Sequence, residues 1–148
     1  MPNNLVEIIT GIQQLLNNDG TLVTLVSNNI AYGRLPDETP LPGIIYQIVY
    51  IPILNTFDNT NLGPVLGKVQ FDVYTPYYSG AVANAVITDA LFSAINRKDI
   101  VLTTGMTSKT IGKLWADDRG MLSQDDKAYR NLIVFNLLTN WFVKLSTK

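Results

Sequence analysis

The sequence predicts an α+β fold: a mostly antiparallel sheet of about four to five strands, packed by two N-terminal helices and one central helix, in the order α-α-β-β-β-α-β-β. Apolar residues near the N-terminus recur at the three- and four-residue spacing of an amphipathic helix. Residues 67–75 alternate like a strand with one buried face, and a helical period follows from residue 79. We expect residues 1–148 to form a single domain, because this length is near the commonest domain size.

Two helices are predicted at the N-terminus. The apolar residues of the first lie on one stripe: Leu5, Ile8, Ile9, Ile12, Leu15 and Leu16. Asn3 or Asn4 can cap its start, and residues 17–20 tolerate the left-handed conformation that often ends a helix. Thr21 then opens a second, shorter helix, and a small strand follows at residues 30–32.

The segment from Gly33 to Pro42 is predicted to be a stiff surface loop, because it contains three prolines. A loop held by proline loses less entropy when a partner orders it. Its candidate partner-contact residues are Arg34, Leu35, Asp37 and Glu38. The alternative is a plain connector.

A strand is expected from Gly43 to Ile51, and its two apolar faces indicate cover by helices or neighbouring subunits. The polar stretch at residues 52–66 is rich in turn-forming residues and is expected to project from a hairpin. Phe57 and Asp58 at this tip are candidate contact residues, although the stretch can also be a tolerated insertion.

The chain is organised around residues 67–96. Val69, Phe71, Val73 and Thr75 form the predicted buried face of a strand, which ends at Pro76 because proline has no N–H to donate. Ser79 is expected to cap the next helix. That helix should lie on the sheet through a stripe made of Ala81, Ala85, Ile87, Thr88, Leu91, Phe92 and Ile95.

Two further strands are predicted in the C-terminal third of the chain. Residues 97–106 are interpreted as the end of the helix followed by an irregular segment, with Arg97 and Lys98 complementing the helix dipole. Residues 109–116 form a strand. Residues 131–143 form a long apolar strand that must be paired or covered to avoid aggregation.

Carboxylates cluster between these strands, at residues 117–127. Asp117, Asp118, Asp125 and Asp126 can bind a hard cation such as Ca²⁺, but the spacing is not that of an EF-hand. The alternative is a solvated hairpin loop that includes Arg119. In an oligomer these acids can also pair across an interface with Arg34 or Lys113, so Asp117, Asp118, Arg119, Asp125 and Asp126 are all candidate contact residues.

The composition points away from several classes of protein. Charged residues make up only 16% of the chain, against roughly 25% in typical soluble domains, so we expect partners to cover part of the surface. The apolar runs are far shorter than the ~20 residues that cross a membrane, and no secretory signal is evident. The 11 basic residues are scattered and the net charge is −1, so we expect no direct binding of nucleic acid.

Catalysis is not expected either. The chain contains no His and no Cys, which removes the usual triads, the usual zinc sites and the commonest general base. It has no glycine-rich phosphate loop. The residue types present still allow a carboxylate pair or a Ser-Lys dyad, but no such residues have a spacing that indicates one. We therefore expect no enzymatic activity and no cofactor.

Three segments of the chain have a distinctive order and wording. Residues 25–36 read Leu-Val-Ser-Asn-Asn-Ile-Ala-Tyr-Gly-Arg-Leu-Pro, residues 41–46 read Leu-Pro-Gly-Ile-Ile-Tyr, and residues 69–74 read Val-Gln-Phe-Asp-Val-Tyr before a helix. These segments resemble the tail completion and tail terminator proteins of tailed bacteriophages. In that family, two helices lead to a short strand, a Pro-containing loop and a strand that opens on a Leu-Pro pair. The resemblance covers residues 5–96. It includes neither the loop at residues 55–64 nor the acidic run.

The resemblance implies a ring, commonly hexameric, that caps the tail tube, ends its polymerisation and presents a surface to the head or neck. Its partners would be further copies of itself, the tail tube protein and a head-tail connector or neck protein. Its location would be the tail or neck of the virion, with assembly in the host cytoplasm. Tube contacts would fall at residues 34–41 and 55–63, and subunit contacts at residues 44–51 and 132–142.

Two other functions stay open. Another neck, connector or minor tail protein would differ in ring number and in whether it binds the head or the tail first. A small ligand-binding α+β domain would need a concave apolar pocket with converging polar groups, and it would stay monomeric.

Overall fold

A computed structural model describes residues 5–36, 39–50, 65–117, 121–124 and 128–139. It contains three α-helices in the predicted places: α1 (Leu5–Asn17), α2 (Gly20–Leu25) and α3 (Gly80–Ile95). A short 3₁₀ turn, η1 (Tyr77–Ser79), leads into α3. Asp19 caps α2 by accepting a hydrogen bond from the Leu22 N–H at 2.9 Å. Ser79 precedes α3 but makes no side-chain capping bond.

Seven strands form one sheet in the described residues. They are β1 (Ile30–Tyr32), β2 (Gly43–Tyr50), β3 (Val65–Pro76), β4 (Lys98–Thr104), β5 (Thr107–Ala116), β6 (Met121–Gln124) and β7 (Ala128–Thr139). The order is β1-β2-β3-β7-β5-β4, and β6 also pairs with β7. β1 runs parallel to β2, while the other pairs are antiparallel, so the sheet is mixed. The prediction of a mostly antiparallel sheet of four to five strands is therefore wrong.

Two strands were missing from the sequence prediction for physical reasons. In β4, only Ile100 and Leu102 are buried, so the alternation is too short to stand out. Arg97, two residues after the end of α3, adopts a left-handed conformation (φ 63°) and leads into this strand. β6 is a four-residue segment whose partner is β7, so backbone pairing rather than an apolar pattern defines it.

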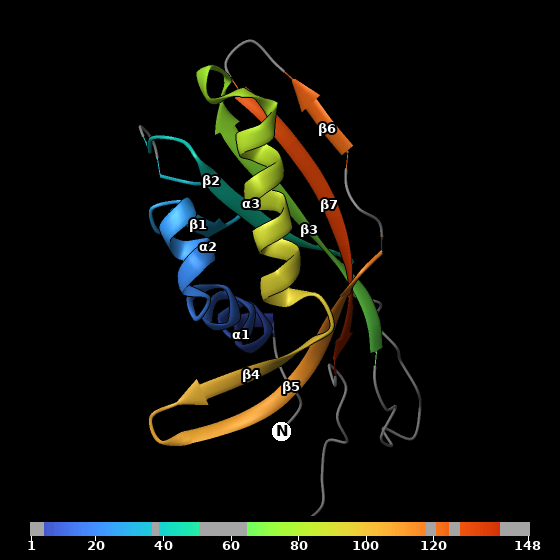
Figure 1. Cartoon of the computed structure of the whole chain (residues 1–148). Coiled ribbons are helices and arrows are strands. Elements are labelled where there is room, and N and C mark those ends of the chain that lie inside the picture. The colour runs from blue at the N-terminus through green and yellow to red at the C-terminus, as the bar shows by residue number, and fades with distance from the viewer. Residues whose placement is uncertain (1–4, 37–38, 51–64, 118–120, 125–127, 140–148) are drawn as a thin grey trace, which may run out of the picture.

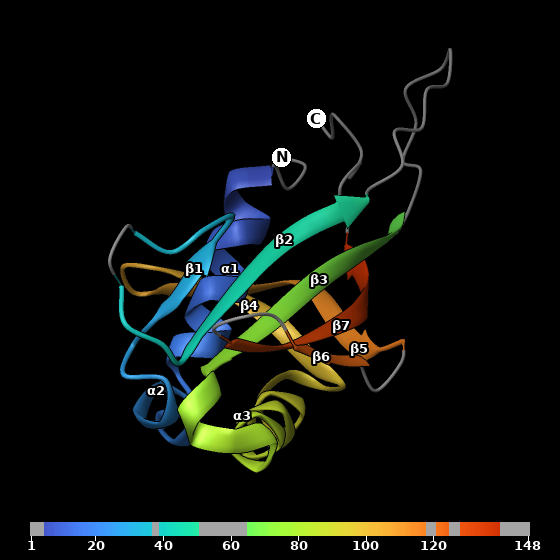
Figure 2. The same cartoon turned by 90° about the horizontal axis from the view of Figure 1, so that it is seen from above.

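The sheet is strongly curved, and the helices occupy its concave side (Figures 1 and 2). α3 packs on β3 and β7, whereas α1 packs mainly on β4, which turns beneath the helices together with β5. The predicted buried face of β3 is confirmed, since Val69, Phe71, Val73 and Thr75 are all buried. On α3, however, Ala85 is exposed, and Asn84 takes a buried position that was not predicted.

A row of aromatic rings crosses the concave face of the sheet. Neighbouring ring centroids lie 5.4, 5.7, 5.3 and 5.5 Å apart along the series Tyr32, Tyr46, Phe71, Phe135 and Phe92. The row begins on β1, passes over β2, β3 and β7, and ends on α3. Such pairs stabilise a core beyond the area they bury. The row therefore joins most of the sheet to its covering helix.

Replacing Phe71 with alanine should destabilise the protein strongly, because Phe71 is fully buried at the centre of this row. We expect Phe71→Ala to lower the free energy of unfolding by about 3–5 kcal/mol. The measurement is urea denaturation followed by circular dichroism. Val49→Ala is the control, because Val49 lies on the open face of β2 and is 54% exposed. Equal losses in the two variants would contradict the described core.

Candidate interaction surfaces

The described part of the proline-rich loop is anchored to the sheet. Asn29 donates its side-chain N–H groups to the carbonyls of Pro40 (2.9 Å) and Pro42 (3.2 Å). Leu35 is half-buried, and its side chain lies so close to Gly43 that an added Cβ there would be 2.6 Å from it. Arg34 is exposed. Of these predicted contact residues, Arg34 thus has an accessible side chain, whereas Leu35 serves to hold the loop.

Most of the other predicted contact residues lie outside the described residues. These are Asp37, Glu38, Phe57, Asp58, Asp118, Arg119, Asp125 and Asp126. The proposed role of each therefore stays a prediction. Within the described residues, no group of three or more His, Cys, Asp or Glu side chains is placed to hold a metal ion.

Asp117 connects the end of β5 to β3 and β7. Its carboxylate accepts a hydrogen bond from Lys68 Nζ at 2.9 Å, and Lys68 also donates to Asn136 Oδ1 at 3.0 Å. The Asp117 N–H donates to the Val134 carbonyl at 2.9 Å. Lys113, the other proposed partner of the acidic run, has its Nζ 3.8 Å from the Asp99 carboxylate. Asp117 and Lys113 thus make ion pairs within the chain.

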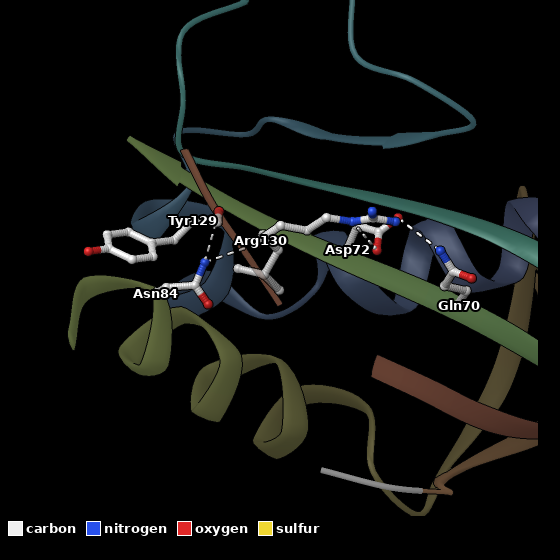
Figure 3. Close-up of polar contacts among 6 residues, drawn as sticks. Gln70, Asp72, Asn84, Tyr129 and Arg130 are labelled. Carbon is white, nitrogen blue, oxygen red and sulfur yellow. Dashed lines mark hydrogen bonds and ion pairs between the residues drawn. The ribbon is translucent and has the colours of Figure 1, made fainter. Parts of the chain in front are cut away.

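A buried polar network fixes α3 against the sheet. Asn84 Nδ2 donates to the carbonyl of Tyr129 at 3.3 Å (Figure 3). It also donates to the carbonyl of Val73 at 2.9 Å and lies 3.2 Å from Thr75 Oγ1. Thr88 Oγ1 donates to Asn84 Oδ1 at 3.3 Å. Because buried polar groups need partners, and these bonds can form in only one orientation of α3 about its axis, the network fixes that orientation. The signal in the sequence is that Asn84 stands four residues before Thr88 on the buried stripe.

A second polar cluster lies on the other face of the sheet. Asp72 is nearly buried and accepts hydrogen bonds from Gln70 Nε2 and Arg130 Nε, each at 3.1 Å (Figure 3). The Arg130 guanidinium also lies 5.8 Å from the Tyr74 ring centroid. The hydrogen bond that Arg130 donates to Asp72 raises the pKa of Arg130, so its guanidinium stays charged at any physiological pH. This cluster cross-links β3 and β7.

The outer side of α3 is apolar and open. Tyr78, Val82 and Val86, which we call the α3 patch, are exposed by 82%, 77% and 48%. Beside them is an apolar hollow of about 240 Å³, lined mainly by Leu25, Pro42, Pro76, Ala83, Val86 and Ile87. By length and composition alone Tyr77–Ile95 could span a membrane, but its opposite side is packed on the sheet. Contiguous exposed apolar surface is a feature of interaction sites on soluble proteins.

The β4–β5 hairpin is a projecting arm that ends in a methionine. Met106 is fully exposed at the turn, where Gly105 adopts a positive φ of 61°. The edge of β4 is held by Gln14 of α1, which donates to the Thr103 carbonyl and accepts from the Thr103 N–H, both at 2.9 Å. The arm is thereby fixed to the body of the chain.

Comparison with known proteins establishes the fold. No protein-family model matches the chain. No curated protein matches it. A solved chain from the virion of a native gene transfer agent particle superposes with a TM-score of 0.60 at 20% identity, over 86% of this chain and 90% of that one. A second solved chain, which carries no functional name, superposes with a TM-score of 0.58 at 10% identity, over 92% and 98%. The chain thus has a fold that occurs in a virion particle.

Removing the Asn84 amide should destabilise the protein, because buried carbonyls of Val73 and Tyr129 would lose a donor. We expect Asn84→Ala to lower the free energy of unfolding by about 2–3 kcal/mol, measured by urea denaturation. Asn17→Ala is the matched control, since Asn17 is an exposed helical residue and surface changes stay within about 0.5 kcal/mol. A neutral effect of Asn84→Ala would contradict the network.

The Asp117 ion pair should make stability depend on pH. The hydrogen bond and charge of Lys68 lower the pKa of the Asp117 carboxyl below its ordinary value of 3.8. Its contribution is therefore present above that value and is lost as the pH falls through the folded-state pKa. We expect Asp117→Asn to lower the urea midpoint at about pH 7 and to match the wild type at about pH 2. An equal difference at both pH values would argue against the pair.

Proposed function

We propose that this chain is a structural protein of a tailed-phage-like virion. The observation that carries the proposal is the fold, which is shared along nearly the whole length of a chain from a gene transfer agent virion. The low charge of the sequence and the open apolar patch on α3 support a protein that functions in an assembly. Its proposed location is the virion.

Within this class we propose a tail terminator, a ring that caps the tail tube and offers a surface for the head. The support is the resemblance of residues 25–36, 41–46 and 69–74 to that family. The proposed partners are further copies of the chain, the tail tube protein and a neck or connector protein. We propose a structural role without catalysis or a cofactor, because the sequence lacks both His and Cys.

Two alternatives remain to be compared with the terminator. Another neck, connector or minor tail protein would use the same partners in a different ring. For a ligand-binding domain, the hollow beside α3 offers Thr75 and Ser79 as polar lining, and the Thr75 hydroxyl is already within 3.2 Å of Asn84 Nδ2. This sparse polar lining gives a small ligand little to orient it, so the hollow suits an apolar side chain better.

A capping ring makes a clear prediction about location and assembly. Gold-labelled antibody against the chain should bind one end of isolated tails, at the end that joins the head. The purified chain, added to polymerising tail tube protein from the same particle, should shorten the tubes and occupy one end. Light scattering and negative-stain images of the purified chain should show closed rings, with or without tubes.

The control is the same chain unfolded by heat, which should leave tube length unchanged. Label at the head vertex instead of the tail end would favour a connector. A chain that labels no part of the particle and stays monomeric beside tubes would contradict the proposal and favour the ligand-binding domain.

A further inference from the structure

Two exposed apolar features lie far apart in the folded structure, at opposite ends of α3. One is the α3 patch with its adjoining hollow, at the N-terminal half of α3. The other is Met106 at the tip of the β4–β5 hairpin, which turns beneath the opposite end of the helices (Figure 1). Because of this separation, the two features cannot meet within a single copy. They can meet between copies.

The hollow has the chemistry of a socket for an apolar side chain. None of the described residues that line it is charged. An engineered cavity of about 150 Å³ binds benzene, so a hollow of about 240 Å³ holds one large apolar side chain. Tyr78 and Val82 stand exposed beside it. Side chains in that position exclude water from a central anchor, as at the hot spots of protein interfaces.

The hairpin tip carries a side chain that suits this hollow. Methionine is unbranched and adapts to irregular apolar gaps. The Gln14 side chain holds the arm at Thr103, so little conformational freedom remains to be lost when the tip docks. Uncharged residues flank Met106 on both sides, from Thr103 to Ser108. No charge next to the tip needs to be desolvated.

The charges that border the two features are complementary. Asp89 follows Val86 on the same outer stripe of α3 and is exposed. Lys109 lies three residues beyond Met106, and its Nζ is half-exposed at 3.6 Å from Glu7. A tip docked in the hollow of another copy can be oriented so that Lys109 faces Asp89 in place of its own Glu7. Such rim pairs favour one orientation of docking more than they add affinity.

We propose that Met106 of one copy seats in the hollow beside α3 of the next copy. The two halves of this contact come from different surfaces, so the interface is heterologous, and its repetition gives a ring where the rotation closes and an open filament where it does not. The inference rests on the proposed function for the closure of the ring. The contact itself is a property of the isolated chain.

Cysteine cross-linking tests the contact directly, because the chain contains no native cysteine. Met106→Cys and Val86→Cys are purified separately, mixed in equal amounts and oxidised. We expect a disulfide-linked dimer in the mixture, well above the level in either variant alone. The matched control pairs Met106→Cys with Ser93→Cys, which is exposed on the same helix but farther from the hollow. That mixture should give only the background level.

A second measurement keeps the native hollow intact. Met106→Ala should weaken self-association about ten- to a hundred-fold in sedimentation experiments, as the loss of an anchor side chain does. Its thermal unfolding should not change, since Met106 is fully exposed. Thr107→Ala, on the neighbouring position of the hairpin, is the control and should retain the association of the wild type.

The two proposals fail in different ways. Equal cross-linking with Val86→Cys and Ser93→Cys, or none with either, overturns this contact, even if the wild-type chain labels tail ends. A selective cross-link in a chain that labels no part of the particle supports the contact and contradicts the proposed function. Unchanged association of Met106→Ala overturns the contact as well.

Discussion

The fold depends on the aromatic row that crosses the concave face of the sheet. Tyr46 and Phe71 stack between β2 and β3, and the row continues through Phe135 to α3. Tyr46 also donates a hydrogen bond to Gln13 Oε1 at 2.6 Å, which ties α1 to the same row. Gln13 in turn donates to the Ile30 carbonyl of β1 at 3.3 Å. One continuous contact thus sets the positions of two helices and four strands.

The Asn84 network fixes the rotation of α3 about its axis. The apolar core alone cannot do so, because apolar packing tolerates several rotations of an apolar helix. The carbonyls that accept from Asn84 come from β3 and β7, so its bonds orient α3 with respect to both strands. In that orientation, Ile87 and Leu91 face the core, while Val82 and Val86 face outward. The open apolar surface is therefore a consequence of buried polar bonds.

The sequence predicted the parts of this molecule that have a strong period. The helices and the buried face of β3 follow from spacing, because each buries a continuous stripe. β4 and β6 do not follow from spacing, because these strands form through pairing with their neighbours and have little apolar pattern of their own. The ion pair of Asp117 with Lys68 depends on how β3, β7 and β5 align, which local pattern does not contain. The burial of Asn84 was not predicted, because a polar residue within an apolar stripe looks like a break in that stripe.

The amide of Gln14 also bears on how the chain behaves when many copies are made at once. By donating to and accepting from Thr103, it occupies the N–H and C=O of that residue, which a foreign strand would use on β4. An unpaired strand edge of this length can pair with strands of further chains, which leads to aggregation. A single glutamine therefore hinders strand addition at this point of the sheet edge, while side chains elsewhere stay free to bind.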